Sequence, residues 1–140
     1  MNIKHFFDNQ LMKTGLLPRQ DWNGVDVVLI ISTGRTGTKF FAEFFRGIPG
    51  VLPLHEPRPD FLRYALEYAR GGINADEAVR HIEKNRRALC RLVRRNSAQT
   101  YIESNNRLFP LLKPFREVFP DSKIIYIVRD GRDYVRSGMS

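Results

Sequence analysis

Cysteine is nearly absent from this 140-residue chain, in which Cys90 is the only one. A single cysteine excludes an internal disulfide and mildly favours a reducing compartment. Cys90 lies in a helical pattern, where a buried and inert thiol is the expected state and a nucleophile is the alternative.

Long apolar runs are also missing. No apolar run is longer than five residues, the length of Val27 to Ile31, which is far shorter than the roughly 20 residues that span a bilayer. The first 13 residues, MNIKHFFDNQLMK, contain no continuous apolar segment of the kind found in signal peptides. The sequence therefore predicts no membrane span, and we expect a cytoplasmic protein.

Acidic residues are scarce relative to basic ones. The 15 Asp and Glu stand against 23 Lys and Arg, which gives a formal net charge of +8. Such an excess favours anionic partners such as phosphates, nucleic acid, acidic glycans or an anionic membrane, without choosing among them. No RNA-binding aromatic signature and no cluster of zinc ligands is present, so a nucleic-acid module is not expected.

Strand and helix patterns alternate along most of the chain. Residues 1–24 contain several helix breakers and predict a short helix and a connector, and residues 25–140 predict one α/β domain. Strands are expected at residues 25–32, 51–54, 99–104 and 122–130. Helices are expected at residues 38–46, 61–70, 74–96 and 106–119, the last interrupted by two prolines, and another begins at Gly131. This alternation predicts a three-layer parallel α/β sheet with right-handed crossovers.

The expected helix 74–96 has two different faces. Asn74 and Glu77 resemble a capping box at its start. An apolar stripe and a basic face then run along it. The stripe consists of Val79, Ile82, Leu89 and Val93, and the basic face of Arg80, Lys84, Arg87, Arg91 and Arg94. A solvated basic face is the ordinary interpretation, and attraction of an acidic partner is the alternative.

The segment STGRTGTK, residues 32–39, joins the first expected strand to the first helix. A Walker A loop requires the pattern GxxxxGK[ST], whereas here Gly34 and Gly37 are too close together and Phe40 replaces the hydroxyl residue. The segment nevertheless contains the groups that bind anions, because it combines free amides at a helix start with hydroxyl and cationic side chains. A purely structural turn is the alternative.

A second chemical pattern follows the last expected strand. The strand KIIYIV ends at Arg129, and Ser137 comes eight residues later. An arginine at the carboxyl end of a strand and a serine in the next helix can both face the crevice where α/β sheets bind ligands. This pair suits a second phosphate group.

Together the two segments resemble the paired signatures of sulfotransferases that use 3′-phosphoadenosine 5′-phosphosulfate (PAPS). In that family, a strand-turn-helix grips the 5′-phosphosulfate, and a later strand ending in Arg, with a Ser eight residues on, grips the 3′-phosphate. The matching segments here are GRTGTKFF and IIYIVRDGRDYVRSGMS, in the same order. The resemblance implies a P-loop-like fold that the chain contains only in part, because family members continue beyond the second motif.

The resemblance also assigns roles to individual residues. It implies that Arg129 and Ser137 hold the 3′-phosphate. It implies that the 5′-phosphosulfate is held by Arg35, Thr36, Gly37, Thr38 and Lys39. Lys39 stands where most members have a hydroxyl residue. Arg35 and the helix-start amides would stabilise the transferred group without a metal, since a sulfuryl group carries less charge than a terminal phosphate.

Transfer to an acceptor hydroxyl or amine also needs a proton acceptor near the sulfate. Cytosolic members place a His where this chain has Asn105. Glu56 instead resembles the Glu that serves as base in tyrosylprotein-type and several bacterial members. The alternatives are His55, Glu103, a base beyond this chain, or a purely structural Glu56 paired with Arg58.

The sequence thus predicts a cytoplasmic PAPS-dependent sulfotransferase domain, with PAPS as co-substrate and no metal. A non-catalytic nucleotide- or polyanion-binding protein and an atypical P-loop kinase are the alternative functions.

Overall fold

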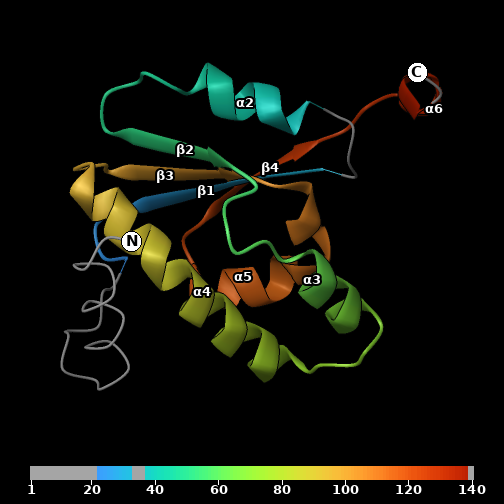
Figure 1. Ribbon diagram of the computed structural model, residues 1–140, viewed down its shortest axis with the longest axis horizontal. Coiled ribbons are helices and arrows are strands. Elements are labelled where there is room, and N and C mark those ends of the chain that lie inside the picture. The colour runs from blue at the N-terminus through green and yellow to red at the C-terminus, as the bar shows by residue number, and fades with distance from the viewer. Residues whose placement is uncertain (1–21, 33–36, 139–140) are drawn as a thin grey trace, which may run out of the picture.

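The computed structural model describes residues 22–32 and 37–138, with the backbone alone at residues 134, 137 and 138. Its four strands form one parallel sheet in the order β2-β3-β1-β4 (Figure 1). The strands are β1 (Asp26–Ser32), β2 (Val51–His55), β3 (Thr100–Ser104) and β4 (Lys123–Ile127). The helices are α2 (Thr38–Phe44), α3 (Leu62–Ala69), α4 (Ala75–Arg95), the 3₁₀ helix η1 (Asn106–Leu111), α5 (Leu112–Val118) and α6 (Gly131–Gly138). The expected parallel α/β fold is confirmed.

The helices cover the sheet from two sides. Figure 1 shows α2 on one face and α3, α4 and α5 on the other. The strand order explains this division, because the step from β1 to β2 runs in the opposite direction to the steps from β2 to β3 and from β3 to β4. Right-handed crossovers in opposite directions place their helices on opposite faces.

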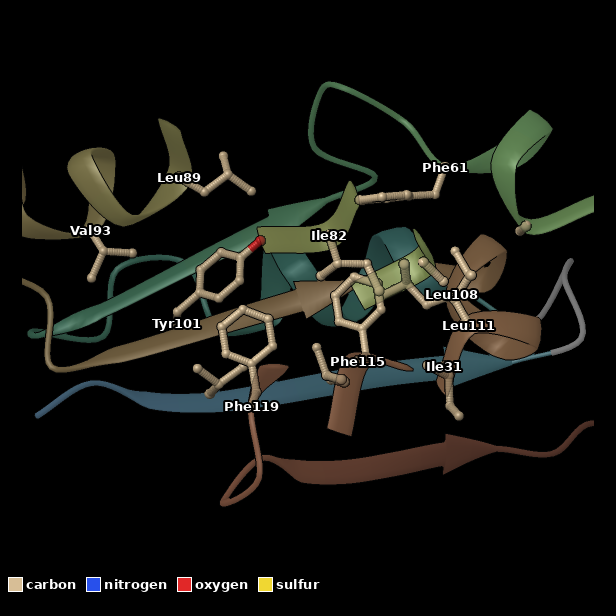
Figure 2. Packing of buried hydrophobic residues seen from close by; sticks show 14 of the residues in the cluster. Ile31, Phe61, Ile82, Leu89, Val93, Tyr101, Leu108, Leu111, Phe115 and Phe119 are labelled. Carbon is tan, nitrogen blue, oxygen red and sulfur yellow. The ribbon is translucent and has the colours of Figure 1, made fainter. Parts of the chain in front are cut away.

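The main core lies between the sheet and the larger helical layer. On each strand, every second side chain faces this core, as Ile31 of β1 and Tyr101 of β3 do. They pack in one cluster with Ile82 from α4 and Phe115 from α5 (Figure 2). Phe61, just before α3, closes this core beside Phe115, with 5.6 Å between the ring centroids. Cys90 is buried, as the helical pattern predicts.

The expected elements agree with the structure to within a few residues. The interruption expected in residues 106–119 takes the form of a 3₁₀ helix followed by a short α-helix. Pro110 lies inside the 3₁₀ segment, and a proline removes an amide donor and disfavours a continuous α-helix. The capping box is confirmed, since the Asn74 side chain accepts from the Glu77 amide and the Glu77 carboxylate accepts from the Asn74 amide.

Parallel pairing brings all four strand ends to one edge of the sheet. Ser104 of β3 pairs with His55 of β2, and Ser32 of β1 pairs with Ile127 of β4. We call this side, marked by these four residues, the carboxyl edge. Ligands of open α/β sheets bind at this edge, where neighbouring strands send their connections to opposite faces. Here those strands are β1 and β3.

No helix in residues 22–32 and 37–138 is long and apolar enough to cross a membrane. A short helix and a connector are expected at residues 1–24, and residues 1–21 of that segment lie outside the described residues.

Candidate functional site

The first motif begins at the end of β1 and runs into α2. Arg35 and Thr36, which the resemblance assigns to the 5′-phosphosulfate, lie outside the described residues. Gly37 precedes α2 with φ 83°, a left-handed conformation that glycine adopts without steric cost. Thr38 is buried at the first position of the helix, and Lys39 beside it is exposed.

The start of α2 is attached to the end of β3. The Ser104 hydroxyl donates to the carbonyl of Thr38. The Asn105 amide continues the sheet by donating to the carbonyl of Ile30 across 2.9 Å. The first bond holds the start of α2 against the end of β3, and the second extends the pairing of β3 with β1 by one residue.

The second motif follows β4 at the same edge. Arg129 is exposed two residues beyond the strand, and Ser137 lies in α6. Asp130 between them accepts from Nε, Nη2 and the backbone amide of Arg132 at 3.1, 2.9 and 2.8 Å. These bonds, the side-chain ones first, hold the pKa of the Asp130 carboxyl below its usual value. Asp130 therefore stays ionised and organises the turn into α6.

Strand pairing makes the two motifs neighbours. Ser32 and Ile127 are directly paired, so the turn after β1 and the segment carrying Arg129 leave adjacent strands. Adjacent strands lie about 4.8 Å apart. Two segments separated by some ninety residues of sequence therefore begin side by side at the carboxyl edge, as binding of one ligand by both motifs requires.

Glu56 lies at this edge on the far side of β3 from β1. Its backbone amide donates to the carbonyl of Ser104 at 3.1 Å, and its φ of 44° ends the strand geometry. Its carboxylate lies 3.1 Å from Nη2 of Arg107, with 23% of the side chain exposed. The expected alternative pairing with Arg58 is wrong in this structure, because Arg58 instead contacts Asp60 at 2.8 Å.

His55, the alternative base, is held in a defined orientation. Its Nδ1 lies 3.1 Å from the carbonyl oxygen of Ser104. A carbonyl oxygen only accepts hydrogen bonds, so Nδ1 carries the proton and Nε2 is the basic nitrogen of the neutral ring. The rule that adjacent strand residues face opposite sides does not decide between His55 and Glu56, because Glu56 has left the strand geometry.

Glu103 is wrong as a candidate base. Its side chain is completely buried, with Oε1 2.6 Å from Nη2 of Arg86 and Oε2 2.8 Å from the Tyr101 hydroxyl. Asn105 donates a third bond to Oε1 at 3.0 Å. A carboxylate so enclosed and so fully hydrogen-bonded has no access to an acceptor and serves the fold instead.

Arg86 is the centre of this buried network, and sequence reasoning missed it. The side chain is fully buried, its guanidinium carbon lies 4.2 Å from the centre of the Phe61 ring, and Nη1 donates to the carbonyl of Pro59 at 3.2 Å. Burial, and then the charge of Glu103, raise the pKa of Tyr101 well above its usual value, so its hydroxyl stays protonated and donates. One arginine thus ties α4 to β3 and to the loop that follows β2.

The network extends to Glu56. Asn105, which donates to Glu103, also accepts from the backbone amide of Arg107 at 3.0 Å. Arg107 then contacts Glu56, and its Nη1 lies 3.7 Å from Asp60. The loop carrying Glu56 is therefore held twice, through Pro59 and through Arg107, and both links lead back to the buried pair of Arg86 and Glu103.

Comparisons with protein-family models, with curated proteins and with solved structures found no match for this chain. Within the part of the chain that the structure describes, no group of three or more His, Cys, Asp or Glu side chains is placed to hold a metal ion.

Proposed function

We propose that this chain is a PAPS-binding sulfotransferase domain, which transfers a sulfuryl group from PAPS to an acceptor hydroxyl or amine. The observation that carries the proposal is the direct pairing of Ser32 with Ile127, which makes the two motifs neighbours at the carboxyl edge. A ligand with phosphate groups at both ends of a nucleoside needs two separate grips, and this edge is where α/β sheets bind nucleotides.

In this proposal, the turn after β1 binds the 5′-phosphosulfate, and the segment after β4 binds the 3′-phosphate. The first grip consists of Arg35, Thr36, Gly37, Thr38 and Lys39. The second consists of Arg129 and Ser137. Arginine suits both grips, because its planar guanidinium makes paired hydrogen bonds to phosphate and sulfate oxygens. The formal charge of +8 further favours an anionic co-substrate.

Glu56 is the proposed proton acceptor. Glu56 follows β2, which lies on one side of β1 across β3. Arg129 follows β4, which lies on the other side of β1. This order leaves the sulfate end of the co-substrate on the side of the acceptor and the base. Arg107, whose Nη2 lies 3.1 Å from the Glu56 carboxylate, keeps that carboxylate in a fixed position, from which it would take a proton from the attacking group.

Calorimetry with 3′-phosphoadenosine 5′-phosphate, compared with ATP and magnesium, tests the proposal. We expect saturable binding of the bisphosphate and much weaker binding of ATP, because the second grip is specific for a 3′-phosphate. Preference for ATP with magnesium would instead favour the alternative function of an atypical P-loop kinase. A third possible result is binding of heparin that is lost at high salt, with no binding of the bisphosphate. This result would favour a polyanion-binding protein that uses the basic face of α4.

Replacing Arg129 with alanine tests the second grip separately. We expect affinity for 3′-phosphoadenosine 5′-phosphate to fall by about 10- to 100-fold, which is the range for losing a hydrogen-bonded charge contact. Affinity for adenosine 5′-phosphate should change little, because that ligand lacks the 3′-phosphate. Arg116→Ala, an exposed arginine on α5, removes the same charge elsewhere and is the control. Equal losses for the two nucleotides would remove Arg129 from the 3′-phosphate site.

A further inference from the structure

A cavity of about 450 Å³ opens at the amino edge of the sheet, opposite the carboxyl edge. It lies between the segment entering β1, the middle of α4 and the end of α5. Its volume falls in the range of small-molecule sites, roughly 300–1,000 Å³. The two proposed nucleotide grips leave from the other ends of the same strands, so this cavity has no part in them.

One side of the cavity is apolar and rigid. Trp22 lies against Tyr101 and Phe119, with ring centroids 5.2 and 5.1 Å apart, respectively. The apolar lining also includes Val25, Val27, Val118 and Pro120. Because Trp22 is packed on two buried rings, this wall is already formed in the absence of a ligand.

The charged side chains around the cavity are mostly acidic. Asp26 from β1, Glu83 from α4 and Asp121 before β4 all line it, and Arg87 is the one basic residue among the lining residues. Carboxylates therefore outnumber cations here, in a chain whose formal net charge is +8. A hollow with an excess of one sign of charge attracts ligands of the opposite sign, and Arg87 offsets only part of the acidic excess here.

A hydrogen-bonding group in the lining also lacks a partner. The Ser122 hydroxyl oxygen is buried and makes no hydrogen bond to any residue that the structure describes. Buried polar atoms in proteins nearly always have a partner, so each exception needs an explanation. The oxygen is also shielded from the cavity itself, so a polar ligand there would supply the missing partner only once the Ser122 side chain rotates.

We propose that this cavity binds an organic cation, in which an aliphatic body lies along Trp22 and ammonium groups contact the carboxylates of Asp26 and Asp121. The apolar wall favours a ligand with hydrocarbon over a bare metal ion, and the acidic rim disfavours phosphates and carboxylic acids. Indole rings also attract ammonium groups directly. The site is independent of the proposed sulfotransferase activity, so each can fail without the other.

The chain reports on this site by itself, because Trp22 is its only tryptophan. Titration with 1,5-diaminopentane at constant ionic strength is expected to change the tryptophan fluorescence saturably, whereas pentanoate should not. The double variant Asp26→Asn and Asp121→Asn should weaken the diamine at least tenfold. Glu117→Gln, an exposed carboxylate on α5 outside the lining, is the matched control and should bind as the parent does.

Three outcomes would overturn the proposal. The first is a fluorescence that does not saturate with the diamine. The second is equal affinity in the parent and in the double variant, which would mean that the acidic rim does not bind the ligand. The third is an equal response to magnesium chloride at the same ionic strength, which would reduce the effect to unspecific attraction of cations.

Discussion

Replacing Arg86 with methionine is expected to lower the free energy of unfolding by about 3–5 kcal/mol. Methionine keeps much of the side-chain volume but removes the charge that Glu103 contacts at 2.6 Å. Both side chains are completely buried, so the carboxylate would be left in the core without its cation. Chemical denaturation followed by circular dichroism measures the change.

A neighbouring arginine provides the control for this experiment. Arg87→Met makes the same chemical change at an exposed position of α4 and should alter stability by less than about 0.5 kcal/mol. Adding Glu103→Gln to Arg86→Met should restore part of the loss, because the unpaired charge is then removed as well. Stability within about 1 kcal/mol of the parent for Arg86→Met would show that the buried pair is not ionised as described.

For the proposed sulfotransferase activity, replacing Glu56 with glutamine is expected to lower sulfuryl transfer by about 10²- to 10⁴-fold, which is the usual contribution of a general base. Glutamine has nearly the same shape but accepts no proton at neutral pH. Release of 3′-phosphoadenosine 5′-phosphate in the presence of a panel of phenols and amines measures turnover. Calorimetry on the same variant measures co-substrate binding, which should stay within a few-fold of the parent.

The fold should tolerate this change. Glu56 is partly exposed, and Arg107 keeps Asp60 as a second carboxylate neighbour. A partly exposed ion pair contributes about 1 kcal/mol or less, so a loss of activity is separable from unfolding. Glu43→Gln, an exposed glutamate on α2, serves as the control. Undiminished turnover in Glu56→Gln would reject Glu56 as the base, and His55→Asn would then be the next variant to assay.

Much of the fold can be predicted from the sequence because its signals are local. The run Val27 to Ile31 is apolar at every position, as expected for a strand covered on both faces, and the capping box at Asn74 marks the start of α4. The order of the strands is not a local property. The sequence therefore predicts a parallel sheet, but not that β1 pairs with both β3 and β4.

The candidate site was predicted less completely, for a related reason. Arg86 occupies the apolar stripe of α4, four residues after Ile82 and three before Leu89, and this position is the signal that it is buried. Its partner Glu103 lies on another element, so the sequence alone does not predict their pairing. Without that pairing, Glu103 remains a candidate base and Arg86 has no assigned role. Pairings between distant segments also decide that Glu56 contacts Arg107 rather than the nearby Arg58.

The place of β1 in the sheet also has a consequence for how the chain folds. β1 is the first strand in the sequence, yet both of its neighbours are formed by much later segments, through pairs such as Asp26 with Thr100 and Ser32 with Ile127. Closing such long loops costs entropy before any contact compensates for it. Folding dominated by pairs so distant in sequence is slow, and until β3 is synthesised the most apolar strand has no partner. During synthesis, β1 is therefore an apolar segment without a partner strand, which favours aggregation and chaperone binding.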